Sequence, residues 1–119
     1  MILGWSDLNA DERALVANGC GGKGSLIPVP DWLFGASCNQ HDFYYWRGGT
    51  EDDRRKADWQ FYLAMREDAR LTPWWYPSRL AIMRAWIYYK AVRLFAAGYF
   101  HFGQQRGRAE LDAAMGLVD

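Results

Sequence analysis

The chain has 119 residues, of which half are apolar and 17% aromatic, and this composition predicts one folded domain rather than a disordered chain. The formal net charge is zero, which argues against nucleic acid as the main partner. No stretch of about 18 uncharged apolar residues is present, so the sequence predicts no membrane-spanning helix.

The first predicted elements lie on either side of a glycine-rich segment. Asn9 and Glu12 have the spacing of a capping box, which predicts a short helix ending near 18–19. The segment 19–24 contains four glycines and predicts a loop. A short extended piece over 25–30 follows, because prolines disfavour helix there.

The rest of the chain has helical patterns separated by glycine and proline. Asp31 is a candidate cap for the second helix, although Gly35 leaves its start uncertain. Thr50 with Asp53 predicts the cap of the third helix. The predicted helices cover about 31–46, 50–70, 78–100 and, with a weaker pattern, 109–115. No repeat and no strong strand pattern is present, so the predicted fold class is all-α.

The second and third helices are joined by only three residues, 48–50, and so short a link favours an antiparallel hairpin. Positions equally far from the link face each other in such a hairpin, and this pairs His41 with Asp58. We expect Asp58 to hold the imidazole by its Nδ1–H and to leave Nε2 free as a base. Tyr45, one turn after His41, fits a core position and a hydrogen bond to Asp58 equally well.

The segment around His41 contains several side chains of the types that act in proton transfer and cation binding. Cys38, His41 and Tyr45 share one face of the predicted helix, and Asp42 points to its side. One residue then serves as a proton acceptor while its neighbour holds a cation. An adjacent His-Asp pair is also common by chance on a polar surface, but the facing Asp58 and the nearby glycine loop favour a functional interpretation.

The glycine loop has an ordinary and a functional interpretation. The glycines satisfy positive φ angles in any loop. Alternatively, the carbonyls of Cys20, Gly22 and Gly24 join the carboxylate of Asp42 in a site for a hard cation, because such ions take oxygen ligands from backbone and carboxylate groups. Cys20 and Cys38 are either free core cysteines or a disulfide that ties this loop to the helix of His41. Two cysteines alone cannot form a four-ligand zinc site.

The C-terminal part of the chain is basic and aromatic. Residues 71–109 carry six basic side chains, ten aromatic ones and no acid. The helix predicted there is either an ordinary core helix or a surface for anionic lipid. The residues predicted to face a membrane are Trp74, Trp75, Arg79, Trp86, Lys90 and Arg93.

These motifs have the order found in one enzyme family. The run Cys38-Asn39-Gln40-His41-Asp42 with Tyr45, after Asn18-Gly19-Cys20-Gly21, closely resembles calcium-dependent secreted phospholipase A2, most nearly its group XII branch. The resemblance covers roughly 18–66. It implies that His41 is the catalytic base and Asp42 a bidentate calcium ligand. It also implies that Asp58 orients the histidine and that Tyr45 supports Asp58.

The resemblance further implies a disulfide between Cys20 and Cys38, joining calcium loop and catalytic helix. The chain departs from the family because only one disulfide is possible, whereas these enzymes are usually rich in disulfides. The residues 48–50 replace the usual β-wing between the long helices. The basic aromatic helix has no counterpart in the family pattern.

Together these observations predict a single phospholipase A2-like domain over 1–119, with a catalytic core at 18–66 and a basic aromatic helix at 74–102. Its two long antiparallel helices and calcium loop are expected to catalyse Ca²⁺-dependent hydrolysis of the sn-2 ester of glycerophospholipids at a membrane or micelle surface. The alternatives are a non-catalytic membrane-binding or membrane-disrupting protein and a helical interaction module with a structural cation. We expect a secreted or exported protein, although the N-terminus does not read as a signal peptide. The sequence does not predict the oligomeric state.

Overall fold

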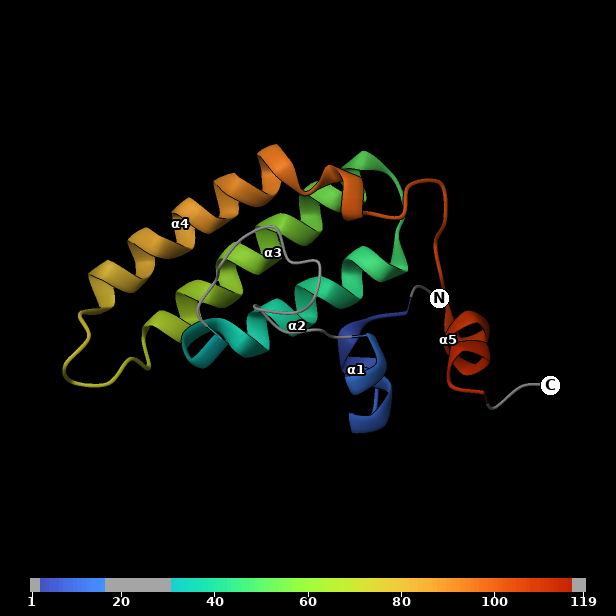
Figure 1. Ribbon diagram of the computed structural model, residues 1–119, viewed down its shortest axis with the longest axis horizontal. Helices are drawn as coiled ribbons and strands as arrows, with labels where there is room; N and C mark the ends of the chain where they lie inside the picture. Colours follow the sequence, from blue (N-terminus) through green and yellow to red (C-terminus); the bar gives the residue numbers. More distant parts are fainter. Residues whose placement is uncertain (1–2, 17–30, 117–119) are drawn as a thin grey trace.

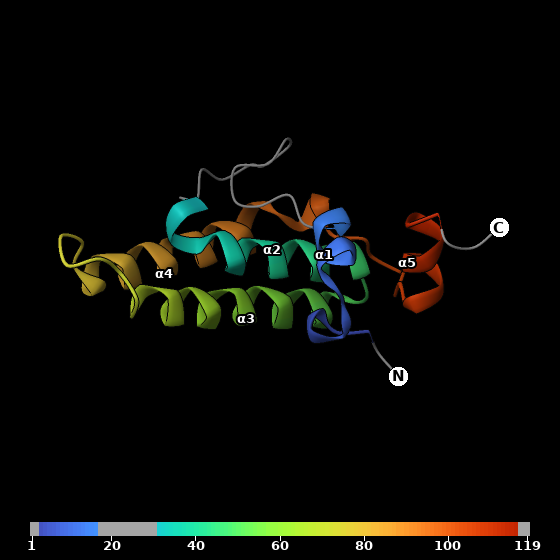
Figure 2. The same cartoon turned by 90° about the horizontal axis from the view of Figure 1, so that it is seen from below.

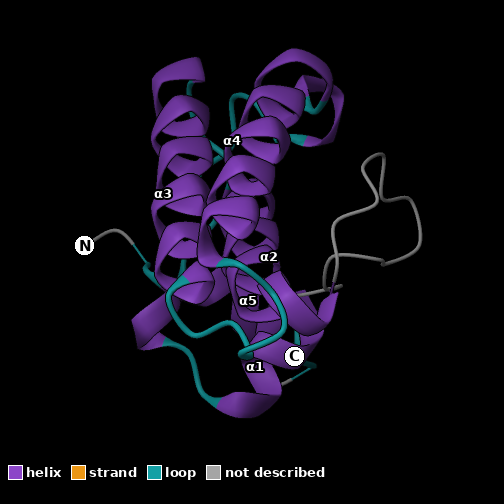
Figure 3. Ribbon diagram, turned by 90° about the vertical axis from the view of Figure 1, so that its left-hand side faces the viewer, coloured by secondary structure: helices purple, strands orange, loops and turns teal. Residues whose placement is uncertain are grey.

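The computed structural model describes residues 3–16 and 31–116, and within them the predicted all-α class is confirmed (Figures 1 and 3). The three predicted loop ligands, Cys20, Gly22 and Gly24, lie outside the described residues. The elements in chain order are η1 (Trp5–Asp7), α1 (Ala10–Val16), α2 (Asp31–Arg47), α3 (Glu51–Ala69), α4 (Ser78–Phe95), η2 (Ala97–Tyr99) and α5 (Arg108–Ala114). None of these helices is long and apolar enough to cross a bilayer.

Three long helices lie side by side and form the body of the molecule (Figures 1 and 2). α2 and α3 form the antiparallel hairpin that the short link predicts, and α4 packs along α3. The short helices α1 and α5 lie toward the end of the bundle where α2 joins α3. The connection from α3 to α4 lies at the opposite end.

Two helix starts have the caps that the sequence predicts. The side chain of Asn9 accepts from the backbone N–H of Glu12 at 2.9 Å, and the Glu12 carboxylate accepts from the N–H of Asn9 at 2.9 Å. Thr50 and Asp53 exchange the same pair of bonds at the start of α3. Each box satisfies two backbone donors that a helix start leaves unpaired.

α2 contains a bend near its start, where Phe34 has φ −123° and ψ 17°. The bend lies directly before Gly35, the residue that leaves the start of this helix uncertain in the sequence. Phe34 is fully buried and contacts the ring of Tyr88 on α4. The first turn of α2 is therefore directed by packing against α4 rather than by helix propensity.

α4 ends at Phe95, five residues before the predicted end near Phe100. Ala96 leaves helical geometry at φ −94° and ψ 2°, and the chain continues as the short η2. The turn brings Phe100 into the core, where its ring meets that of Tyr45 edge-on with centroids 5.1 Å apart. Burial of this ring favours the turn over further helix.

After η2 the chain runs along the link between α2 and α3. The N–H of Gly49 donates to the carbonyl of His101 at 3.3 Å, and the N–H of Gly103 donates to the carbonyl of Gly49 at 3.1 Å. Gly48 has φ +77°, and a Cβ atom there would lie 2.3 Å from the carbonyl oxygen of His101. Glycine at this position therefore permits both the tight link and the close approach of the later chain.

The core between α3 and α4 combines small and aromatic side chains. Ala81 and Ala85 on α4 are fully buried, so the two helix backbones can approach closely. Aromatic pairs also join the two helices, including Tyr62 with Trp86 and Trp59 with Tyr89, whose ring centroids lie 5.4 and 5.5 Å apart. This packing presents the inner face of α4 to the hairpin.

Candidate active site

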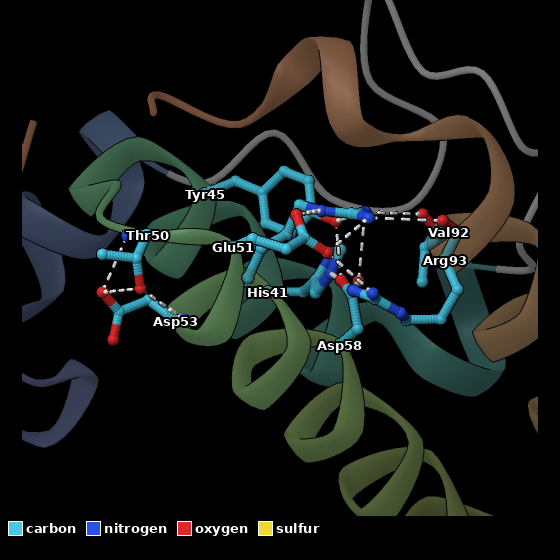
Figure 4. A network of polar contacts seen from close by, with 9 residues as sticks. His41, Tyr45, Thr50, Glu51, Asp53, Asp58, Val92 and Arg93 are labelled. Carbon is cyan, nitrogen blue, oxygen red and sulfur yellow. Dashed lines mark hydrogen bonds and ion pairs between the residues drawn. The ribbon is translucent and has the colours of Figure 1, made fainter. Parts of the chain in front are cut away.

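The site is built around a direct contact between α2 and α3. Nε2 of His41 lies 2.7 Å from Oδ1 of Asp58, so the contact predicted from the hairpin is confirmed (Figure 4). The Asp58 side chain has no exposed surface, and that of His41 is 10% exposed. A buried carboxylate and a nearly buried imidazole are therefore held together away from bulk water.

The nitrogen that makes this contact differs from the prediction. Nε2, rather than Nδ1, faces Asp58. Nε2 lies at the far end of the ring and can span the gap between two helices, whereas Nδ1 lies nearer its own backbone. Because an ionised carboxylate only accepts hydrogen bonds, Nε2 carries the proton and Nδ1 retains the lone pair. Nδ1 is therefore the ring nitrogen whose lone pair is available to accept a proton.

Two aromatic rings flank the imidazole. The Phe61 ring stacks on His41 with centroids 4.4 Å apart and an interplanar angle of 25°. The Tyr45 ring lies 4.3 Å away at 45°. The two rings limit rotation of the imidazole about its side-chain bonds, because core packing leaves little free volume.

Tyr45 also makes the hydrogen bond to Asp58 that is one of its two predicted roles. Its hydroxyl donates to Oδ1 of Asp58 at 2.6 Å, the same oxygen that faces His41. Burial raises the pKa of this phenol, and the Asp58 charge raises it further, so Tyr45 stays a protonated donor. Of the two interpretations of Tyr45, the structure bears out the hydrogen bond as well as burial in the core.

The second oxygen of Asp58 is held by two arginines that the sequence analysis did not place in the site. Nη1 of Arg93 donates to Oδ2 at 2.8 Å, and Nη1 of Arg54 lies 3.4 Å from the same atom. We call Arg54 and Arg93 the arginine pair. Arg54 comes from α3, one turn before Asp58. Arg93 comes from the last turn of α4 (Figure 4).

Glu51 at the start of α3 joins the arginine pair from the solvent side. It accepts from Nε and Nη2 of Arg54 at 2.8 and 3.0 Å, and from Nη2 of Arg93 at 2.8 Å. Hydrogen bonds from Arg54 first and then Arg93 lower the pKa of Glu51 to about 2. Two carboxylates and two guanidinium groups thus balance in charge around the imidazole.

The ionisation of Asp58 follows from its partners. Burial raises the pKa of the carboxyl group, but hydrogen bonds from His41, Tyr45 and Arg93 outweigh burial. The pKa of Asp58 is consequently below its ordinary value. A fully buried acid stays charged here because every one of its oxygen atoms receives donors.

Arg93 was predicted to face a membrane, and the structure corrects this. Its side chain is 22% exposed and binds Asp58 and Glu51 instead of extending into solvent. The long side chain turns inward because a buried carboxylate is a stronger partner than water. A helical-wheel position alone does not reveal that choice.

The other residues predicted to face a membrane are on the surface. Trp74 is 96% exposed and Trp75 58%, both in the connection between α3 and α4. Arg79 and Lys90 are exposed on α4, and the Lys90 ammonium lies 5.5 Å from the ring centre of Trp86.

The predicted calcium ligands are described only in part. Asp42 is half-buried on α2, directly after His41. Among the described residues no group of three or more His, Cys, Asp or Glu side chains is placed to hold a metal ion. Any cation at Asp42 would therefore need oxygen ligands of another kind, which backbone carbonyls supply.

The cysteine alternatives are resolved for Cys38. Cys38 is disulfide-bonded and 5% exposed, four residues before Asp42 on α2. The sequence has one other cysteine, Cys20, which lies outside the described residues. The free-thiol interpretation of Cys38 is therefore wrong.

The two arginines differ in how far the sequence could have revealed them. Arg54 and Tyr45 are equally far from the 48–50 link, so the geometry that pairs His41 with Asp58 also pairs them, and Nη1 of Arg54 lies 3.4 Å from the Tyr45 hydroxyl. Arg93 has no such signal. It follows an eight-residue connection (70–77), which does not determine how α4 is rotated.

No family model, curated protein or solved structure matches the chain. The chemistry of the site therefore has to be argued from its own geometry and from the sequence motif.

Proposed function

We propose that this protein is a calcium-dependent phospholipase A2-like esterase that hydrolyses the sn-2 ester of glycerophospholipids at a membrane surface. The observation that carries the proposal is the buried contact between His41 and Asp58, with Tyr45 on the same carboxylate oxygen. A histidine oriented by a buried carboxylate is a recurrent arrangement for general-base catalysis. The bond class and the position of attack come from the resemblance of the motif around His41 to secreted phospholipase A2.

The proposed reaction begins at Nδ1 of His41. This nitrogen takes a proton from water as the water oxygen bonds to the ester carbonyl carbon. The tetrahedral intermediate then breaks its bond to the glycerol oxygen, which receives the proton from the imidazolium. The products are a fatty acid and a lysophospholipid. Asp58, bonded to Nε2, favours the imidazolium while it exists.

Asp42 is the described residue that fits a calcium ion in this scheme. Its carboxylate, beside His41, would hold the ion together with the carbonyls predicted at Cys20, Gly22 and Gly24. A bound calcium ion supplies positive charge that polarises the ester carbonyl and stabilises the developing oxyanion. The disulfide at Cys38 favours an oxidising compartment, in line with a secreted or exported enzyme.

The proposed membrane surface includes the exposed aromatic residues near the α3–α4 connection. Trp32, from the first turn of α2, is 59% exposed, and its ring centroid lies 5.7 Å from that of Trp75. Leu71 beside them is 84% exposed and Trp74 almost entirely so. We call these four residues the aromatic end. Tryptophan favours the boundary between lipid and water, because it combines a large apolar ring with one donor.

The test is release of fatty acid from mixed phospholipid vesicles by the purified chain. We expect release in the presence of calcium, mainly from the sn-2 position, and none in excess chelator. Undiminished release in chelator would refute the role of the ion. Release from sn-1 alone would refute the assigned position of attack.

A second candidate is a membrane-binding or membrane-disrupting protein without catalysis, and the exposed aromatic end favours it. Trp74 and Leu71 are more exposed than large apolar residues usually are. This candidate predicts leakage of vesicle contents in chelator with no fatty acid released. The two proposals therefore differ in a single paired measurement of leakage and fatty acid.

A further inference from the structure

The two oxygens of the Asp58 carboxylate have separate sets of partners. Oδ1 faces Nε2 of His41 and the Tyr45 hydroxyl, at 2.7 and 2.6 Å. Among the described residues, Oδ2 faces only the arginine pair, at 2.8 Å from Arg93 and 3.4 Å from Arg54. A carboxylate with one oxygen unbound can rotate about its Cβ–Cγ bond, whereas here both oxygens are held.

We propose that Arg93 and Arg54 are positioning residues, which hold Oδ2 of Asp58 so that Oδ1 remains directed at Nε2 of His41. The inference rests on the proposed function only where it concerns the rate of hydrolysis. The orientation of the carboxylate is a property of the site whatever its substrate. Neither arginine touches the reacting atoms in this scheme, so both act through Asp58.

The bonds of Arg54 connect its own helix with α4. It donates to Glu51 on its own helix and to the carbonyl oxygens of Val92 and Arg93 on α4, at 3.2 and 3.3 Å. These carbonyls belong to the last turn of α4, and that of Val92 also accepts from the N–H of Ala96 at 3.1 Å. Arg54 thereby attaches the end of α4 to α3.

Arg93 completes the attachment in the opposite direction, from α4 to α3. Its two Nη atoms donate to Asp58 and Glu51, which lie two turns apart on α3. This fork matches the geometry of guanidinium, with two donors separated by a fixed angle, and lysine cannot reproduce both bonds. The position of Asp58 therefore depends on the docking of α4.

An ion pair on the protein surface would not hold its carboxylate in one orientation in this way. Arg55 and Asp52, on the outer face of the same helix, lie 3.0 Å apart with side chains 60% and 55% exposed. Water competes for both groups there, and such pairs contribute little. Arg55→Met is therefore a matched control. It removes the same charge from the residue next to Arg54, and the side chain of Arg55 does not contact the site.

The first experiment measures the imidazole directly by nitrogen NMR. The chain has two histidines, so a spectrum of the ¹⁵N-histidine-labelled protein with His101→Gln contains the ring signals of His41 alone. We expect the chain with intact arginines to show protonated Nε2 and unprotonated Nδ1, measured where the imidazole is neutral. Arg93→Met should move both signals toward a mixture of tautomers, and Arg55→Met should move neither.

The second experiment measures hydrolysis of a short-chain phospholipid below its micelle concentration, so that membrane binding does not contribute. We expect Arg93→Met to lower kcat by about 10- to 100-fold with KM nearly unchanged, as misplacement of a catalytic group does. Arg93→Lys should recover part of the rate. Glu51→Gln, at a half-exposed position, should give a smaller loss and serves if Arg93→Met does not fold.

The outcomes separate this inference from the proposed function. Unchanged NMR signals in Arg93→Met or, failing its folding, in Glu51→Gln would overturn the positioning role, even if the rate fell. Shifted signals in a protein that never hydrolyses phospholipid would support the positioning role and refute the proposed function. Full activity of Arg93→Met would also overturn the inference.

Discussion

The carboxylate of Asp58 has no contact with solvent, and an isolated charge in such a position would be unstable. It is stable here because four side chains donate to it, from three helices. Tyr45 and His41 come from α2, Arg54 from α3 and Arg93 from α4. The group that orients the proposed base therefore also joins the three long helices.

Removal of one of these donors should weaken both the orientation of the imidazole and the attachment of the three helices to one another. Tyr45→Phe deletes the hydroxyl that lies 2.6 Å from Oδ1 and should lower the free energy of unfolding by about 1.5–3 kcal/mol, the range for hydrogen bonds to charged groups. Denaturation by urea measures this loss. Tyr44→Phe is the matched control, because in the described part of the chain the Tyr44 hydroxyl meets only the neutral N–H of Trp5, at 3.4 Å. An equal loss in both variants would contradict the special position of Tyr45.

The lowered pKa of Asp58 predicts how stability depends on pH. Because the folded state lowers this pKa, the stabilisation is fully present above the ordinary value of about 4 and is lost as pH falls through the folded pKa. Glu51, with a pKa of about 2, contributes in the same direction. Urea unfolding at several pH values between about 5 and 2 should show a steeper decline in the unaltered protein than in Asp58→Asn. Asp52→Asn, the same change at an exposed position, is the control, and equal slopes for Asp58→Asn and the unaltered protein would refute the prediction.

The link between α2 and α3 is the element on which the site geometry depends. Its brevity places His41 opposite Asp58, and Gly48 and Gly49 have φ +77° and +139° there. The same link receives the chain that follows α4, through the carbonyl of His101. A change in the link would therefore disturb the hairpin and the C-terminal segment together.

Gly48→Ala should destabilise the protein for two separable reasons. The new Cβ atom would meet a backbone oxygen at 2.3 Å, and its φ is one that alanine disfavours. Gly103→Ala has the φ cost without a close neighbour, and Gly98→Ala has neither. We expect the melting temperature to fall most in Gly48→Ala, by several degrees, less in Gly103→Ala, and little in Gly98→Ala. The reverse order would show that the close approach at Gly48 does not contribute.

The hairpin and its caps could be predicted because they depend on local rules. Asn9 with Glu12 and Thr50 with Asp53 are capping pairs at fixed spacing, and a three-residue link leaves one arrangement for two long helices. The nitrogen by which His41 meets Asp58 could not be predicted, because it depends on a side-chain rotamer within a packed core. The inward turn of Arg93 could not be predicted either, because the eight-residue connection before α4 does not determine how this helix is rotated about its axis.

The molecule as a whole has two different ends. The end at the α2–α3 link carries α1, α5 and the polar chain after η2, whereas the α3–α4 connection carries the aromatic end (Figure 1). The proposed active site lies between them on the three long helices. This arrangement suits a protein that meets a lipid surface with one end, as the proposed function requires.

Substitution in the aromatic end should weaken binding to vesicles and leave chemistry intact. Trp74→Ala removes a ring that is 96% exposed, so the fold should be unaffected, and partition onto anionic vesicles should fall about tenfold. Hydrolysis of a monomeric substrate should be unchanged. Phe102→Ala removes an exposed ring near the opposite end and is the control. Equal vesicle binding by Trp74→Ala and the unaltered protein would show that lipid meets another surface.

The central claim is that the imidazole bonded to Asp58 performs the chemistry, and the two histidines of the chain allow a direct comparison. The measurement is the initial rate of fatty-acid release in calcium by His41→Gln and by His101→Gln, the latter changing an exposed side chain. We predict that His41→Gln loses a factor of about 100 to 10,000 while His101→Gln stays within about twofold of the unaltered protein. Equal rates in the two variants, with folding preserved in both, would contradict the account.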